Sequence, residues 1–385
     1  MSTAAPPPVP TWTWEGSWDR AKAGVRWGVL QARGLLLRGA VRSSALPPEL
    51  SACGRIVVLR NDRLGDAVLT FPLVNAVKRL APGSEVIYAV REAWAPLFSR
   101  QPHTDRVVAL PRPPREQARV LAGIRPDLII DPRTDPELET ARLCRASKAP
   151  WRVGFSGHGR ERYFTTYLSR PTERRHASDE ALQLLRLWCS DRVPSVTTPF
   201  LTVPAAGQAW WQGVAQDHRA LGKGFVCVHP GAYYATQRWP EARFRELAER
   251  VALELGRPVV WVQPPERASV WRRGAADGVG RAPANRLSLS NLSIEQLAAV
   301  IGRARLFVGN NSGPLHLASA LGIPTLSLMG PTVPERWWPL GKHQVVVRLG
   351  VSCSPCNLGW CSHHTCLRGI EVERVFQAVK DLTIR

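Results

Sequence analysis

Short apolar runs alternate with helix-like segments twice along this chain of 385 residues. In the first half the β-branched runs lie at 55–59, 85–90, 107–110 and 127–130, with helical patterns at 67–80, 93–100 and 115–124. Strands that alternate with helices form βαβ units around a parallel sheet. The first half therefore predicts a Rossmann-like domain.

The second half repeats this alternation after a Pro-containing stretch at 195–207, which we interpret as a linker. Its apolar runs lie at 225–229, 258–262, 306–309 and 325–328, and its helical patterns at 241–255 and 294–304. Two such domains in series place a ligand cleft between the carboxyl ends of their sheets. We expect an α/β fold with two Rossmann-like domains facing a central cleft. The expected parts are an N-terminal extension (1–50), a first domain (51–200), a second domain (208–368) and a C-terminal helix (369–385) that packs back on the first domain.

Composition favours a globular protein in the cytoplasm. Hydrophobic residues make up 44% and charged residues 21% of the chain, an ordinary balance for a folded domain. No stretch approaches the roughly 20 apolar residues of a membrane span. The first ten residues are rich in Pro and Ala and lack the basic region that opens a secretory signal.

Residues 18–42 can form an amphipathic helix. Trp18, Val25 and Val29 fall on one face at helical spacing, and several Arg residues lie outside that stripe. A basic amphipathic helix with tryptophans can lie in an anionic membrane interface, which would place the protein peripherally on the inner face of the cytoplasmic membrane. The alternative is a helix packed on the protein's own surface.

The formal net charge is +20, from 51 Lys and Arg against 31 Asp and Glu. A charge of this size favours an anionic partner, such as phosphorylated substrates, an acidic membrane or nucleic acid. A GC-rich genome produces the same abundance of Arg. The sequence has no basic helix with groove-reading spacing, so we do not expect a nucleic-acid partner.

The segment 308–325 is the most informative motif. It contains a strand, a polar glycine turn and a helix that begins near Pro314, with Ser312 placed to cap it. The free N–H groups and the dipole of such a helix start bind anions, including a pyrophosphate. His316 in the first turn points to the same cleft, unless the segment is only an ordinary capped helix with a satisfied histidine.

Three segments carry a resemblance to glycosyltransferase family 9, the heptosyltransferases. Residues 57–72 resemble the family's first strand and Gly-Asp turn, residues 229–244 its second-domain nucleotide loop, and residues 308–337 its donor-binding signature. The resemblance runs from about Gly54 to the C-terminus. It implies the GT-B architecture and the transfer of a sugar from a nucleotide-sugar donor.

The resemblance assigns the catalytic base to Asp66, where a carboxylate takes the proton of an attacking sugar hydroxyl. Gly65 allows the backbone to turn tightly beside the substrate, and Arg63 in the same turn is assigned to the acceptor. On spacing alone, Asp66 is better explained as a helix cap, and it is the matching second-domain motifs that favour the catalytic role.

The resemblance also assigns a set of donor contacts. They are Gly231, Arg238, Glu266, Asn311, Ser312, Gly313 and His316. The sequence lacks an Asp-x-Asp motif, so we predict no metal and no other cofactor. The helix start and Arg238 then neutralise the leaving pyrophosphate, and Glu266 is assigned to the ribose hydroxyls.

Two residues depart from the family pattern. Gln237 stands where the family often has Lys, and Asn311 where it usually has Asp before Ser/Thr-Gly. The two neutral amides either alter the donor sugar or mark reduced activity. We predict an inverting transferase that moves a sugar, such as heptose from ADP-heptose or a similar donor, to an anionic lipopolysaccharide-like glycolipid or polysaccharide precursor. The alternatives are a transferase for another nucleotide sugar and a catalytically weakened nucleotide-sugar-binding protein.

Four cysteines and two histidines cluster near the C-terminus, at Cys353, Cys356, Cys361, His363, His364 and Cys366. The cluster is consistent with structural zinc, with a thiol-rich loop or with a disulfide.

Overall fold

The computed structural model describes residues 46–384 apart from 172, 174, 190–192 and 264–285. The amphipathic helix expected at 18–42 and the donor contact expected at Glu266 lie outside the described residues. Within the described part of the chain, no helix has the length and apolar character needed to cross a bilayer.

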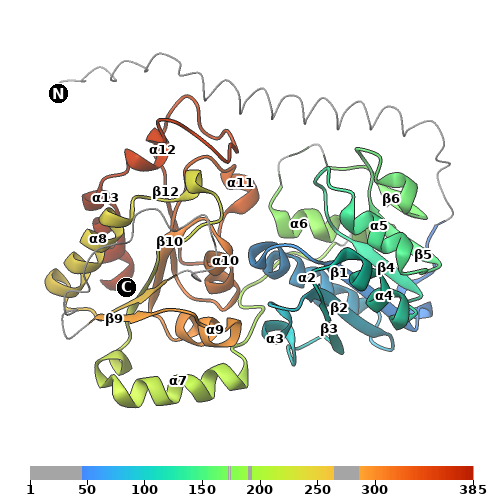
Figure 1. The fold of residues 1–385 in the computed structure, drawn as a ribbon, viewed down its shortest axis with the longest axis horizontal. Coiled ribbons are helices and arrows are strands. Elements are labelled where there is room, and N and C mark those ends of the chain that lie inside the picture. Colours follow the sequence, from blue (N-terminus) through green and yellow to red (C-terminus); the bar gives the residue numbers. More distant parts are fainter. Residues whose placement is uncertain (1–45, 172, 174, 190–192, 264–285, 385) are drawn as a thin grey trace.

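The first sheet has six parallel strands in the order β3-β2-β1-β4-β5-β6 (Figure 1). They are β1 (Arg55–Arg60), β2 (Glu85–Arg91), β3 (Arg106–Leu110), β4 (Leu128–Asp131), β5 (Trp151–Phe155) and β6 (Thr166–Leu168). Strand β1 is buried on both faces, as expected for a parallel sheet covered by helices on each side.

Helices cover both faces of this sheet. The helices are α2 (Leu64–Leu80), α3 (Ala95–Phe98), α4 (Pro114–Ile124), α5 (Glu139–Ala146) and α6 (Ala177–Leu182). Ile56 and Val58 of β1 belong to the core that contains α2 and α6, whereas Val57 and Leu59 belong to the core that contains α4 and α5. The two-residue period of the strand therefore divides its side chains between two helical layers.

The second sheet also has six parallel strands, in the order β12-β11-β10-β7-β8-β9. They are β7 (Val226–His229), β8 (Val259–Val262), β9 (Arg286–Leu289), β10 (Leu306–Asn310), β11 (Thr325–Leu328) and β12 (Gln344–Val347). Counted within each half of the chain, both sheets follow the order 3-2-1-4-5-6 of the Rossmann fold. The predicted pair of Rossmann-like domains is confirmed.

The helices of the second half are α7 (Ala205–Asp217), α8 (Glu241–Glu254), α9 (Ile294–Gly302), α10 (Gly313–Ala320), α11 (Pro334–Trp337), α12 (Thr365–Arg368) and α13 (Val372–Ile384). Helix α7 packs on α9, so the second unit begins before residue 208. Helix α13 packs on α8 and β10, and its Val375 and Phe376 lie in the same core as Phe244. The expectation that the C-terminal helix packs on the first domain is therefore wrong: its apolar face completes the second domain.

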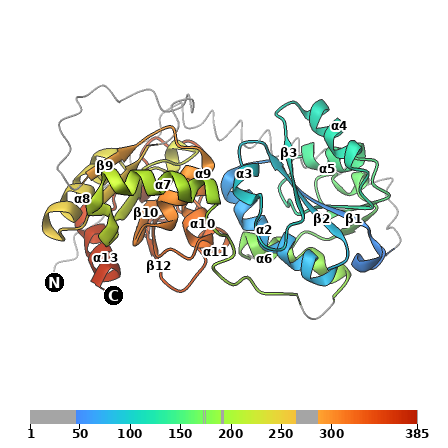
Figure 2. The same cartoon turned by 90° about the horizontal axis from the view of Figure 1, so that it is seen from below.

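The two domains meet where α2 packs against α10 (Figures 1 and 2). One hydrophobic core runs from Val58 and Val68 of the first domain to Leu315 and Ile301 of the second. At the centre of the contact, glycines replace side chains. A Cβ atom on Gly313 would lie 3.0 Å from the backbone nitrogen of Gly65 and 3.0 Å from Cβ of Leu64.

This packing predicts a selective cost for a methyl group at Gly313. Gly313→Ala should lower the free energy of unfolding by about 1–3 kcal/mol, because the added Cβ forces the two backbones apart. Urea denaturation measures this change.

Gly213→Ala is the matched control, because Gly213 lies within α7 and a Cβ there meets no atom within 4 Å. The control should gain about 0.5–1 kcal/mol from reduced backbone entropy. Equal stability of the Gly313→Ala variant and the wild type would show that the two helices are not in contact in solution.

Candidate active site

The candidate site lies where the strand order reverses in each sheet. This reversal falls between β1 and β4 in the first sheet and between β7 and β10 in the second. Ligands of open α/β sheets bind outside the carboxyl ends of the strands at this position. The turn after β1 carries Arg63 and Asp66, and the loops after β7 and β10 carry the donor contacts expected from the sequence.

Asp66 is the third residue of α2, in its first turn. The N-cap position belongs to Arg63, and no side chain makes a capping hydrogen bond there. Instead, the Asp66 carboxylate accepts a hydrogen bond from Nη2 of Arg60 at 2.8 Å. Its side chain is 18% exposed, so it is held by a buried cation and still open to solvent. The geometry does not support the helix-cap interpretation.

A second carboxylate, Asp62, shares Arg60 with Asp66. Nε of Arg60 donates to Oδ1 of Asp62 at 2.9 Å. Arg133, which follows β4, lies 3.9 Å from Asp62 and makes a closer ion pair with Asp135 at 2.8 Å. Burial lowers the pKa of Arg60, but the Asp62 and Asp66 carboxylates raise it by more, so its net shift is upward.

Burial raises the pKa of Asp62 to about 6, and the opposing effect of Arg60 is smaller. Asp62 was not predicted as a site residue, although it is an acidic residue only four positions before Asp66. Only the fold shows that one guanidinium holds both carboxylates.

Arg63 lies at the mouth of the site and contacts the second domain. Its guanidinium lies over the ring of Tyr233 at 4.0 Å and that of Tyr234 at 5.0 Å. Nη2 also donates a hydrogen bond to Oη of Tyr234 at 3.0 Å. Arg63 therefore joins the turn that carries Asp66 to the loop after β7.

Among the buried polar atoms of the second domain that have no hydrogen-bond partner, three lie at the end of β7 or at the start of α10. They are Oγ of Ser312, Nδ1 of His316 and Nδ1 of His229. Ser312 occupies the N-cap position of α10, but its hydroxyl makes no capping bond, contrary to our expectation. Unsatisfied buried polar groups cost free energy unless a ligand or water pairs with them. These three atoms therefore define a candidate binding site at the start of α10 and the end of β7.

The histidines of this site are neutral at physiological pH. Burial and, to a lesser extent, the charge of His176 lower the pKa of His316 to about 3. Burial lowers the pKa of His229 to about 4. Gly231 is required beside His229, because a Cβ atom at this position would lie 2.4 Å from Cε1 of the imidazole.

Arg238 is a cation in the loop between β7 and α8. Its Nε donates to the Ala232 carbonyl at 3.1 Å and its Nη2 to the Tyr233 carbonyl at 3.3 Å. Burial lowers the pKa of Arg238 to about 10, so it remains a cation at neutral pH. Arg238 and Arg63 thus contact the same residue, Tyr233, from the two domains.

Asn311 is buried and donates from Nδ2 to Oγ1 of Thr332 at 2.9 Å. Its neighbour Asn310 fastens two loops together, because it accepts from the Trp239 amide and donates to the Pro230 carbonyl. Gln237 is half-buried at the end of the turn after Tyr234. The two neutral residues therefore lie in the loops that frame the site.

The turn of Asp66 and the start of α10 are in direct contact. A Cβ atom on Gly65 would lie 3.0 Å from Cδ2 of His316 and 3.3 Å from Cα of Gly313. The candidate base and the candidate anion site therefore share one interface. The predicted cluster of Asp66, Ser312, Gly313 and His316 is brought together by the fold.

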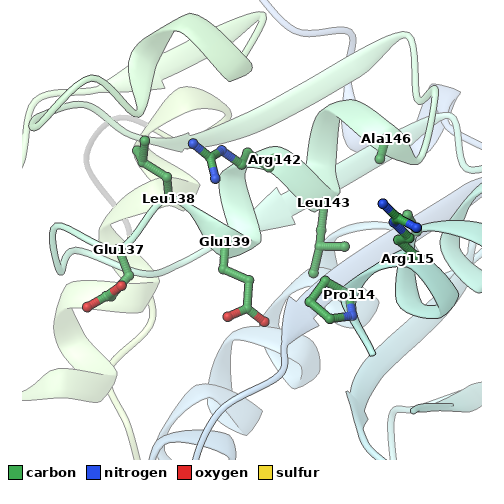
Figure 3. Close-up of a pocket in the computed structure, with 9 residues that line it drawn as sticks. Pro114, Arg115, Glu137, Leu138, Glu139, Arg142, Leu143 and Ala146 are labelled. Carbon is green, nitrogen blue, oxygen red and sulfur yellow. The ribbon is translucent and has the colours of Figure 1, made fainter. Parts of the chain in front are cut away.

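A pocket of about 470 Å³ opens in the first domain between α4 and α5 (Figure 3). Arg115 and Arg142 line it from α4 and α5, together with Glu137 and Glu139. Asn61, next to Asp62, donates from Nδ2 to Oε1 of Glu139 at 2.8 Å. This hydrogen bond connects the pocket wall to the turn that carries Asp66.

All eight cysteines are free thiols, so the structure does not contain the disulfide considered above. Burial and the neighbouring thiols of the cluster raise the pKa of Cys366 to about 11. Among the residues that the structure describes, no group of three or more His, Cys, Asp or Glu side chains is arranged to hold a metal ion.

Comparisons with known proteins agree with this arrangement. Residues 118–365 match the model of glycosyltransferase family 9 (heptosyltransferase). The chain is 28% identical over 336 residues to lipopolysaccharide heptosyltransferase 1 of Pseudomonas aeruginosa, covering 80% of this chain and 88% of that relative.

Two solved structures share the fold. A family 9 glycosyl transferase from Veillonella parvula has a TM-score of 0.71 and 22% identity, over 88% of this chain and 99% of that one. The E. coli ADP-heptose lps heptosyltransferase II has a TM-score of 0.66 and 19% identity, over 86% and 98%.

Two Rossmann-like domains in this arrangement form the GT-B architecture, which the two solved structures share. The chain belongs to glycosyltransferase family 9, the heptosyltransferase family, and is a glycosyltransferase.

The raised pKa of Asp62 predicts a pH-dependent cost to stability. An unfolded Asp ionises near pH 4, whereas folded Asp62 holds its proton to about pH 6. Between these values the folded state binds more protons, so the contribution of Asp62 to stability falls as pH rises. The free energy of unfolding of Asp62→Asn, measured relative to that of the wild type, should therefore be roughly 1–3 kcal/mol higher at pH 7.5 than at pH 4.

Urea denaturation of both proteins at the two pH values measures this difference. A stability difference that is the same at both pH values would mean that Asp62 ionises normally in the folded protein.

Proposed function

We propose that this protein transfers a heptose or related sugar from ADP-heptose or a similar nucleotide sugar to an anionic lipopolysaccharide-like glycolipid or polysaccharide precursor. The reaction inverts the anomeric centre and requires no metal ion. The relatives support this proposal by name, as a lipopolysaccharide heptosyltransferase and an ADP-heptose lps heptosyltransferase.

The proposal rests on the contact between two elements. One is the turn that carries Asp66, and the other is the start of α10, where buried polar atoms have no hydrogen-bond partner. Gly65 and Gly313 lie against each other, with Asp66 on one side and Ser312 and His316 on the other. Oγ of Ser312 and Nδ1 of His316 are buried and have no partner in the protein. A phosphate at the start of α10 would accept a hydrogen bond from Oγ of Ser312 and would lie at the positive end of the helix dipole.

Asp66 is the general base of the proposed reaction. It accepts the proton of the acceptor hydroxyl as the oxygen attacks the anomeric carbon and the bond to the pyrophosphate breaks. The start of α10 and Arg238 stabilise the negative charge that develops on the leaving group. The neutral imidazole of His316 can donate or accept a hydrogen bond there, but it is not a proton source at neutral pH.

A positive group of the first domain suits an anionic acceptor. The Arg63 guanidinium lies against the second domain, in the turn that carries Asp66. The pocket of the first domain is lined by Arg115 and Arg142 but equally by Glu137 and Glu139, so it adds no net positive charge. We assign Arg63 to the acceptor, and the net charge of +20 agrees with an acidic glycolipid at an anionic membrane surface.

Gln237 and Asn311 are the positions that distinguish the donor pocket of this chain. Asn311 keeps its amide on Thr332, so the pocket lacks the negative charge of the family's usual Asp. Gln237 is neutral where the family often has Lys, so the pocket also lacks that positive charge. We propose that the protein is an active transferase in which this pair selects the donor sugar.

Replacement of the base is the first test of the proposal. Asp66→Asn should reduce kcat by about 10²–10⁴-fold, because the amide keeps the shape of the side chain but cannot accept a proton. The Kd for ADP should change little. Transfer from ADP-heptose to a heptose-deficient lipopolysaccharide gives kcat, and calorimetry gives Kd.

Asp105→Asn is the matched control, since Asp105 is an Asp in an ion pair with Lys78 on the same domain. It should retain wild-type turnover. A wild-type kcat in Asp66→Asn would mean that another group is the base.

Nucleotide binding should not require a divalent ion. The positive helix start and Arg238 take the place of a metal on the pyrophosphate. Titration of ADP in the presence of EDTA should give the same Kd as titration with magnesium. Loss of binding in EDTA would contradict the proposed mechanism. Tighter binding of another nucleoside diphosphate would show that the donor is not an ADP-sugar.

A further inference from the structure

The guanidinium of Arg60 holds two carboxylates at once. Its Nη2 contacts Asp66 at 2.8 Å and its Nε contacts Asp62 at 2.9 Å. The Arg60 side chain is 11% exposed, so it depends on these carboxylates for its counter-charge. A buried cation that loses its partner is strongly destabilised.

Asp62 is also linked to a second arginine. Arg133 lies 3.9 Å from Asp62, but it makes its closer contact with Asp135 at 2.8 Å. The network therefore contains two arginines and three aspartates, with one excess negative charge when all are ionised. The Trp94 indole N–H donates to the Asp62 carbonyl at 3.0 Å, which fixes the backbone of the turn.

We propose that Asp62 is a positioning residue for glycosyl transfer: through the shared Arg60, it limits how strongly that arginine holds the carboxylate of Asp66. This inference rests on the proposed role of Asp66 as the base. Asp62 touches neither substrate in this account, and its effect passes through Arg60.

The proton transfer in this reaction explains how Asp62 would act. The acceptor O–H bond breaks, the oxygen bonds to the anomeric carbon, and the nucleoside diphosphate leaves with the electrons of the broken C–O bond. The proton moves to the oxygen of Asp66 that Arg60 does not hold. Asp66 is then neutral, and without Asp62 the buried Arg60 would face no anion. Because Asp62 remains ionised, Arg60 stays paired and the proton transfer costs less free energy.

Several charged or titratable groups surround the two carboxylates. They are Arg60 on β1, Tyr88 on β2, Arg63 in the turn, Arg133 and Asp135 after β4, and His316 on α10. His316 is neutral and Tyr88 keeps its proton, because burial raises its pKa well above the ordinary value. Burial raises the pKa of Asp62 to about 6, so the charge of Asp62 changes closest to neutral pH.

The test is the pH profile of kcat/KM in Asp62→Asn, with ADP-heptose as donor and heptose-deficient lipopolysaccharide as acceptor. In this variant Arg60 keeps only one carboxylate partner, Asp66, and therefore holds it more strongly. The acidic limb of the profile should move to lower pH by roughly one unit, and kcat at pH 8 should fall by about tenfold or more because the base is weaker. The Kd for ADP should stay unchanged.

Asp135→Asn provides a second variant at a more exposed position, where the side chain is 37% exposed. This change frees Arg133 to pair with Asp62 and draws Asp62 away from Arg60. The acidic limb should move in the same direction as in Asp62→Asn, but by less. Asp62→Glu keeps the negative charge and should restore most of the wild-type profile.

The outcomes separate this inference from the proposed function. An acidic limb that stays in place in both Asp62→Asn and Asp135→Asn, whatever the change in kcat, overturns the inference and leaves the role of Asp66 intact. Should Asp62→Asn fail to fold, the profile of Asp135→Asn decides alone. Full activity in Asp66→Asn instead removes the proposed base itself.

Discussion

The close approach of α2 and α10 is the constraint on which the rest of the structure depends. A backbone contact of this kind requires glycine on both sides, at Gly65 and Gly313. The contact joins the two domains into one hydrophobic core. It also sets the distance between the carboxylate turn and the anion-binding helix start, because each glycine is within one residue of a candidate functional side chain.

Charge is arranged differently on the two sides of this contact. In the first domain, Arg60 and Arg133 form ion pairs with three aspartates after β1 and β4. The second domain offers neutral donors and acceptors, since burial keeps His229 and His316 uncharged, and Arg238 is its cation nearest the mouth. The proposed base in the first domain must accept a proton, whereas the second domain must stabilise the negative charge of the leaving group, so the two sites need different electrostatic environments.

The sequence was sufficient to predict the two Rossmann-like domains, because strand and helix periods alternate clearly in both halves. It also predicted the grouping of Asp66 with Ser312 and His316, which follows from the strand-order reversal. It could not predict that α13 packs on α8, because an apolar helix face does not specify its partner. Asp62 was missed for a related reason: its importance comes from sharing Arg60 and from a neighbour, Arg133, some 70 residues away. The Ser312 hydroxyl was expected to cap α10, and only the three-dimensional geometry shows it without a partner.

A crystal structure of the protein with bound ADP tests the central claim most directly. The account predicts the pyrophosphate at the first turn of α10, in hydrogen-bonding distance of Oγ of Ser312, with the Asp66 carboxylate facing it across the domain contact. A pyrophosphate bound elsewhere, for example between Arg115 and Arg142 in the pocket of the first domain, would contradict the assignment of both the donor site and the base.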